Sequence, residues 1–252
     1  MWEIKLIWAL SVEGKSVIKK LSSVCLMAVA LASCEQKLSA TLYLRDIQQM
    51  MTSNQNVEKP VDIKIDILET GMENQCERPS GKEIVELVGT YFEKATLLGC
   101  EKIAGSMNGR MSIKVTTRLS RTEQNETPAM HLLEFQAGPT PEKASDPLFI
   151  RFDANKYADL QAKLKRLNGM ISIKISDTHL ALTINNDLRS DASLAIYTGV
   201  YVDGQPLEFQ EDRVLKPREE TVIEFGDVKS AYLGRVGWGY ILGLNHESQS
   251  SQ

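Results

Sequence analysis

Several segments of this chain alternate between apolar and polar residues, most clearly 61–68 (VDIKIDIL) and 110–119 (RMSIKVTTRL). Successive side chains of a β-strand point to opposite faces of a sheet, so this pattern predicts strands with one buried and one solvated face. Such half-buried strands are typical of antiparallel sheets. Short apolar runs bounded by turn residues predict further strands later in the chain, among them 206–210 (PLEFQ) and 232–242.

Two segments instead have the period of an α-helix. In the first, Ser80 and Glu83 form a capping-box pattern ahead of an apolar stripe that reaches Phe92. The second follows Asp153 and ends at Asn168-Gly169. The sequence therefore predicts the α+β class.

A polar run at 120–128 (SRTEQNETP) is the best domain linker. We expect a β-α-β-β domain at 41–120 and a mostly antiparallel, β-sandwich-like domain with one helix at 130–245. Residues 246–252 are expected to form a disordered tail.

The N-terminal region contains an apolar stretch at 21–32 that follows Lys19 and Lys20. It is too short to span a bilayer, which takes about 20 residues, but it has the length and flanking charge of a secretory signal. The stretch ends in Leu31-Ala32-Ser33-Cys34 (LASC), with small residues immediately before a thiol. This motif resembles the lipobox of bacterial lipoproteins at each of its positions.

The resemblance implies that residues 1–33 are a signal peptide, that the chain is cut before Cys34, and that Cys34 carries a diacylglyceryl thioether. Two or more acyl chains anchor a protein stably to a bilayer. Residues 34–40 would then be a short polar tether. The alternative is a hydrophobic core helix that contains a cysteine by chance.

Acidic residues at Glu3 and Glu13 do not fit a basic signal region, so translation starting at Val17 is a further hypothesis. Removal of residues 1–33 takes away four basic and two acidic residues, which changes the formal net charge from −4 to −6. An acidic chain without a long basic run is a poor ligand for phosphates, so we expect no nucleic-acid partner.

The chain has four cysteines. Cys25 would leave with the signal peptide and Cys34 would carry lipid, so Cys76 and Cys100 remain. In an oxidising compartment these two are expected to form a disulfide, with two free buried thiols as the alternative. Two cysteines alone do not make a zinc site, and we expect no metal or other cofactor.

Catalytic motifs are absent from the sequence: it has no G-x-S-x-G, no H-E-x-x-H and no P-loop. Asp177 and His179 form the one acid/base pair that can be named, although a DTH sequence more often forms a strand tip. His131 and Glu134 fall in one predicted strand at a spacing that places them on opposite faces, so they are not expected to form a ligand pair.

Three aromatic residues share one face of the predicted strand 232–242, namely Tyr232, Trp238 and Tyr240. If this face is exposed, it is a partner-binding patch, because Trp and Tyr dominate interface energetics. If it is buried, it fills the core, which is the interpretation we favour in a chain with few aromatic residues.

These features predict an exported lipoprotein held in the bilayer by Cys34, with a role in binding or envelope assembly and an envelope protein as its partner. The layout resembles uncharacterised lipoproteins of bacterial genomes and prophages. In lipoproteins of enteric-type bacteria, Asp after the lipid cysteine favours inner-membrane retention. The residue here is Glu35, which favours the outer membrane, facing the periplasm. The alternative function is an enzyme such as a hydrolase of an envelope polymer, which requires a concave site lined by carboxylates.

Overall fold

Long strands and a few helices make up the structure. The computed structural model describes residues 36–52, 58–121, 129–138, 146–167 and 178–244. The first half contains β1 (Gln36–Tyr43), α2 (Leu44–Thr52), β2 (Glu58–Thr70), the 3-10 helix η1 (Met72–Glu77), α3 (Pro79–Gly89), β3 (Lys94–Lys102) and β4 (Asn108–Arg121). The second half contains β5 (Leu133–Ala137), β6 (Asp146–Phe152), α4 (Ala154–Leu167), β7 (Thr178–Asn185), β8 (Ala192–Ile196), β9 (Val200–Val202), β10 (Gln205–Pro206), β11 (Glu211–Leu215), β12 (Glu220–Phe225), α5 (Asp227–Val236) and β13 (Trp238–Leu244).

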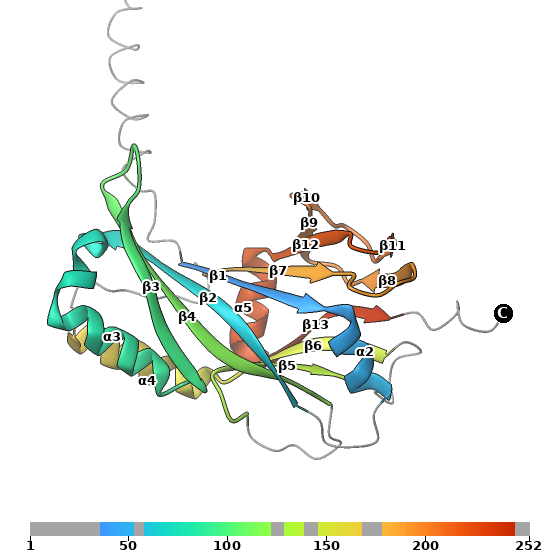
Figure 1. Ribbon diagram of the computed structural model, residues 1–252, viewed down its shortest axis with the longest axis horizontal. Coiled ribbons are helices and arrows are strands. Elements are labelled where there is room, and N and C mark those ends of the chain that lie inside the picture. Colours follow the sequence, from blue (N-terminus) through green and yellow to red (C-terminus); the bar gives the residue numbers. More distant parts are fainter. Residues whose placement is uncertain (1–35, 53–57, 122–128, 139–145, 168–177, 245–252) are drawn as a thin grey trace, which may run out of the picture. The chain divides into compact units, whose positions relative to one another are not determined.

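Thirteen strands of the described residues form one mostly antiparallel sheet (Figure 1). Their order is β10-β9-β12-β7-β1-β2-β4-β5-β6-β13-β8-β11, with β3 also paired to β4. The parallel neighbours are β1 with β7 and β4 with β5. The predicted α+β class with mainly antiparallel strands is therefore confirmed.

The two segments with the clearest alternation, β2 and β4, pair along their whole length, from Glu58 opposite Ser120 to Thr70 opposite Asn108. Alternate residues of both strands are buried on one face, among them Ile63, Ile67 and Ile113. The opposite face carries the polar residues of the pattern. The edge of β4 that does not pair with β2 is shared by two strands. β3 pairs with the first part of this edge and β5 with its last three residues.

β1 differs from the sequence prediction, which placed a tether at 34–40. In the structure β1 begins at Gln36 and lies between β2 and β7 in the middle of the sheet. Its alternate residues Leu38, Ala40 and Leu42 face the core, with exposed or half-buried polar residues between them. The prediction of a tether was wrong because the small residues Ser39 and Ala40 hide the alternation of this strand.

The strand order also joins the two predicted domains, 41–120 and 130–245. β7 pairs with β1, and β5 pairs with β4, so both ranges contribute neighbouring strands to the same sheet. One apolar core runs through both ranges. The described residues from Gln36 onward belong to one compact unit.

Three helices, α3, α4 and α5, cover the apolar face of the sheet. Val88 of α3, Leu160 of α4 and Leu233 of α5 line a small apolar cavity against strand residues such as Ile65 and Leu180. The cavity measures about 60 Å³, which is room for a few water molecules. The helices therefore pack on the sheet around a small apolar void.

The predicted cysteine pair is present: Cys76 of η1 is joined to Cys100 of β3, with Cα atoms 5.7 Å apart. The bond ties the loop before α3 to the strand after it, across a sequence separation of 24 residues. In the chain-entropy description, closing a loop of that length stabilises the fold by roughly 3.5 kcal/mol. The capping box predicted at Ser80 does not form, because Arg78 is the N-cap and the Ser80 hydroxyl donates to Gln75 Oε1 at 2.7 Å.

The predicted strand 232–242 is also corrected. Its first half belongs to α5, which ends at Val236 with Gly237 as its C-cap, and only Trp238–Leu244 form β13. Gly237 has φ of 83°, and its N–H donates to the Leu233 carbonyl, which is the left-handed cap that ends many helices. The predicted strand 206–210 is reduced to the short β10, and Phe209 is exposed.

Close packing around the disulfide generates the first prediction. A Cβ added at Gly81 would lie 2.0 Å from the backbone oxygen of Gln75, whereas one added at Gly99 meets no atom within 4 Å. Because a backbone oxygen cannot rotate away, Gly81→Ala is expected to cost about 2–3 kcal/mol and lower Tm by roughly 5–10 °C. Gly99→Ala is the matched control and should stay within about 1 kcal/mol of the wild type. Thermal unfolding followed by circular dichroism makes the comparison, and equal Tm values for both variants would contradict it.

Candidate functional site

A cluster of four aromatic rings lies where β13 pairs with β6 and β8. Trp238 and Tyr240 are two residues apart on β13 and so project from the same face, with ring centroids 5.1 Å apart. Tyr240 is the centre of the cluster, because its ring also lies 5.6 Å from Tyr197 and 6.2 Å from Phe149. Tilted and edge contacts at these distances are favourable arrangements for aromatic pairs. We call Phe149, Tyr197, Trp238 and Tyr240 the aromatic cluster.

The aromatic cluster is neither core nor fully exposed. Trp238 keeps 39% of its surface accessible, and the other three rings are half-buried. The preferred sequence interpretation, a buried core face, therefore does not hold for Trp238. Rigid Trp and Tyr side chains that are partly held by their neighbours are well suited to protein interfaces, because binding orders few additional rotamers.

Of the three aromatic residues predicted to share one face, the structure brings Trp238 and Tyr240 together. Tyr232 lies on α5 instead, where its ring contacts the Arg235 guanidinium at 6.0 Å. Sequence reasoning missed Phe149 and Tyr197, because only the register of β13 on β6 and the turn after β8 bring them to Tyr240.

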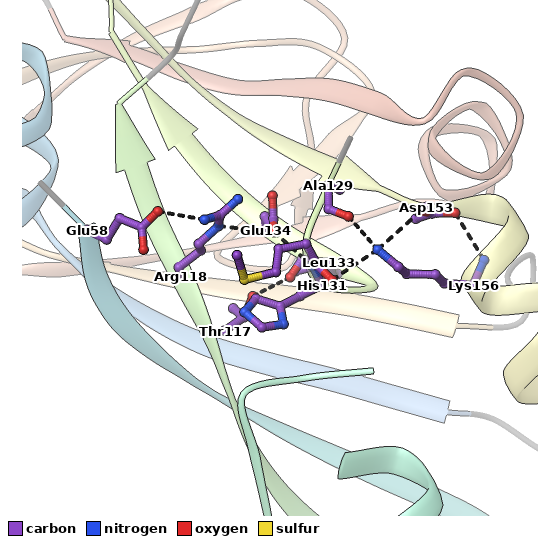
Figure 2. Close-up of polar contacts among 10 residues, drawn as sticks. Glu58, Thr117, Arg118, Ala129, His131, Leu133, Glu134, Asp153 and Lys156 are labelled. Atoms are coloured by element: carbon purple, nitrogen blue, oxygen red, sulfur yellow. Dashed lines mark hydrogen bonds and ion pairs between the residues drawn. The ribbon is translucent and has the colours of Figure 1, made fainter. Parts of the chain in front are cut away.

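A second group of polar residues surrounds Glu134, whose side chain is fully buried (Figure 2). Glu134 lies beside Arg118, and its Oε1 accepts hydrogen bonds from Arg118 Nε at 3.1 Å and from the His131 backbone N–H at 2.9 Å. Arg118 Nη1 also binds Glu58 Oε1 at 2.6 Å. A buried carboxylate requires such compensation, because losing its partner costs several kcal/mol.

His131 lies in the bend before β5, so the expected strand geometry was wrong at this position. β5 begins at Leu133, and this brings the His131 backbone, rather than its imidazole, onto the Glu134 carboxylate. Burial lowers the pKa of His131 below its ordinary value of 6.5, and the positive charges of Arg118 and Lys156 act in the same direction. The negative charges of Glu134 and Glu93 oppose this shift.

Lys156 fastens the same segment to α4. Its Nζ donates to the carbonyl oxygens of Ala129 and Met130 and lies 3.5 Å from Asp153 Oδ2 (Figure 2). Asp153 Oδ1 in turn accepts the N–H groups of Asn155 and Lys156, each at 3.0 Å, at the start of α4. Together these contacts connect residues 129–134 to β4 and to α4.

This buried polar group is arranged for structural support rather than for catalysis. Glu134 Oε1 is already occupied by two donors, while its Oε2 is buried without a hydrogen-bond partner among the described residues. The principal hollows lined by described residues include neither Glu134 nor His131. The carboxylate of Glu134 is therefore closed off from these hollows.

The polar face of the sheet has two shallow hollows of about 550 and 670 Å³, both lined in part by Ser39, Lys64 and Thr183. Asp62 and Asp66, which line one hollow each, are engaged with neighbouring side chains, and Asp46 in the first hollow lies 3.6 Å from Lys59. Glu224 lines the second hollow together with His179. Asp62 accepts from Thr116 at 2.8 Å and pairs with Lys114 at 3.3 Å. Asp66, which is buried, accepts from Ser112 at 2.5 Å and from Lys64 at 3.1 Å. These pairs resemble the charge ladders of a solvated sheet face more than an acid/base site.

The other predicted site residues fall in different places. Cys34 and Asp177 lie outside the described residues, as do residues 1–33 and 246–252. His179 is exposed on β7 and borders a hollow together with Glu224. Among the described residues no group of His, Cys, Asp and Glu side chains is placed to hold a metal ion. None of the described helices has the length and hydropathy needed to cross a membrane.

The lowered pKa of His131 generates a prediction about pH. The unfolded chain takes up a proton near pH 6.5, whereas the folded chain does so only at lower pH, so stability is expected to fall as the pH drops below about 6.5. His131→Gln should remove this contribution and reduce the pH slope of the unfolding free energy by at most about 1.4 kcal/mol per pH unit. Urea unfolding between pH 7.5 and 5 measures the slope. His179→Gln, which removes an exposed histidine, is the matched control, and identical slopes for wild type and His131→Gln would refute the prediction.

Comparison with known proteins identifies a family that covers most of the chain. A family described as a domain of unknown function (DUF7424) matches residues 36–249. No curated protein and no solved structure matches the chain. The matched region begins where β1 begins and includes both the aromatic cluster and the disulfide. The chain therefore belongs to the family of the domain of unknown function DUF7424.

Proposed function

We propose that this protein is an exported lipoprotein, anchored in a membrane through Cys34, that binds an envelope protein through the aromatic cluster. The observation that carries the proposal is the position of the LASC motif. It ends at Cys34, and β1, the first strand of the compact unit, starts two residues later. A cleavage before Cys34 would therefore release the folded body with an intact first strand.

The disulfide supports export. Cys76 and Cys100 are joined in the structure, and stable structural disulfides are a property of proteins in oxidising compartments. A cytosolic location would leave these two cysteines reduced and the η1 loop without its covalent tie. Glu35 after the lipid cysteine supports the outer membrane, facing the periplasm, as the place of attachment.

Binding is favoured over catalysis by the distribution of side chains. The carboxylate of Glu134 is buried, and Asp62 and Asp66 in the surface hollows are paired with lysines. In contrast, the aromatic cluster presents Trp238, which is partly exposed and is supported by the neighbouring rings. Side chains of this kind contribute disproportionately to protein–protein affinity.

Metabolic labelling tests the anchor. Labelled palmitate should enter the wild-type protein in growing bacteria, and Cys34→Ala should abolish the incorporation because the acceptor thiol is gone. Cys25→Ala is the matched control: it removes the other cysteine of the N-terminal region, which leaves with the signal peptide, so label should persist. Incorporation that survives Cys34→Ala, or that depends on Cys25, would contradict the proposal.

Crosslinking in intact membranes tests the binding surface. Trp238→Ala should lower the affinity for the partner at least tenfold, because an interface Trp typically contributes about 2 kcal/mol or more to binding. The adduct formed by the wild-type protein should therefore be lost. Tyr232→Ala is the control, because Tyr232 is equally exposed but lies on α5 outside the aromatic cluster. Circular dichroism establishes that both variants fold, and an adduct that depends on neither residue would exclude the cluster as the site.

A further inference from the structure

The start of β1 fixes which end of the sheet lies close to an acylated Cys34. Gln36 pairs with Ile67 of β2, and Ile67 pairs with Met111 of β4, so these three residues form one row across the sheet. Cys34 precedes Gln36 by two residues, and its Cα can therefore lie at most about 7 Å beyond this row, whatever the conformation of the chain there.

The β3–β4 hairpin extends past the same row in the same direction. β2 continues three residues beyond Ile67, to Thr70 opposite Asn108, which is about 10 Å of strand. Neighbouring strands are rotated by roughly 20–25° relative to one another, and β4 lies two strands away from β1. After these two rotations, about 7 Å of the 10 Å lie along the direction of β1. The turn at 103–107 adds to that distance, and Figure 1 shows the hairpin projecting beyond the start of β1. The tip therefore reaches at least as far as Cys34 can.

The hairpin tip, residues 103–107, has a defined conformation. The Ser106 N–H donates to the Ile103 carbonyl at 3.2 Å, and Gly105 has φ of 75°, the value that a type II turn requires at this position. The Asn108 N–H donates to Ser106 Oγ at 3.1 Å. A tip that is held in this way presents the same side chains persistently.

The composition of the tip is unusual for an exposed loop. Residues 103–109 (IAGSMNG) contain no charge, in a chain of which 25% is charged. Met107 leaves 80% of its surface exposed. Cations flank this segment: Lys102 is exposed, and Arg110 is held 3.1 Å from Glu101. An uncharged tip with an exposed Met beside an exposed Lys matches the chemistry of a bilayer surface, where apolar groups enter the interface and a cation meets lipid phosphates.

We propose that the β3–β4 hairpin tip is a second contact with the phospholipid bilayer, in which Met107 enters the interface next to the lipid anchor. The inference rests on the proposed acylation of Cys34, which brings this end of the sheet to the membrane. Two contacts, one covalent lipid and one hairpin, hold the folded body in a fixed orientation on the surface.

Depth-dependent fluorescence quenching tests this contact. Trp238 is the one tryptophan of the chain after residue 34, so Trp238→Phe gives a silent background. Met107→Trp in that background places a fluorophore at the tip. Met130→Trp is the matched control, because Met130 is also exposed, at 63%, but lies near the end of the sheet that is distant from the tip. Met130 lies three residues before Leu133, whose carbonyl accepts a hydrogen bond from Thr117. Thr117 lies six residues along β4 from Met111, which is about 20 Å away from the row of Met111 in the direction opposite to the tip.

The full-length protein is produced in bacteria, extracted from membranes and reconstituted into vesicles of phosphatidylethanolamine and phosphatidylglycerol that contain brominated phosphatidylcholine. Partition into the detergent phase of a phase-separating detergent reports whether each preparation is acylated. The proposal predicts at least twofold stronger quenching for Met107→Trp than for Met130→Trp.

The two ways to fail are distinguishable. An acylated protein with equal quenching at both positions overturns the hairpin contact and leaves the anchor standing. A protein that does not partition into the detergent phase overturns the anchor and the hairpin contact together. Both substitutions are at exposed side chains, and circular dichroism of each variant verifies the fold.

Discussion

The pairing of β1 with its two neighbours is the interaction on which the rest of the fold depends. β1 pairs antiparallel with β2 and parallel with β7, from Gln36 opposite Thr178 to Tyr43 opposite Asn185. In the strand order, β7, β12, β9 and β10 join the other strands of the sheet through β1. At the far end of the pair, Arg45 adds hydrogen bonds to Asp187 of 2.9 and 2.8 Å.

This central position gives the proposed anchor a mechanical consequence. A lipid on Cys34 would be connected to the middle of the sheet by one residue, Glu35, rather than by a flexible linker. A long flexible tether would let the folded body move away from the surface, whereas this short connection restricts it to the neighbourhood of the bilayer. The disulfide and the β3–β4 hairpin lie toward the same end of the sheet as the start of β1.

Sequence patterns predicted those features that depend on local periodicity or on simple counting. The alternation of β2 and β4, the helices α3 and α4, and the pairing of Cys76 with Cys100 are all visible in the chain. The first part of β1, residues 36–40, was assigned to a tether because Ser39 and Ala40 are too small to mark a strand. α5 was missed because Gly237, which ends that helix, also suits a twisted strand.

Pairing between strands that are distant in the sequence was the other feature that could not be predicted. The buried Arg118–Glu134 pair requires the parallel register of β4 and β5, and the aromatic cluster requires β13 to lie between β6 and β8. Neither register has a signal in a single sequence, so Phe149, Tyr197 and Arg118 could not be assigned to a site. Trp238 and Tyr240 were found because residues two apart on a strand share a face.

The central claim, a lipid anchor directly before the central strand, is tested most directly by the intact mass of the protein extracted from bacterial membranes. The account predicts a chain that begins at Cys34 and carries the added mass of diacylglyceryl and an N-linked acyl group, with two hydrogens missing for the bond between Cys76 and Cys100. An unmodified chain that retains residues before Cys34 would contradict it.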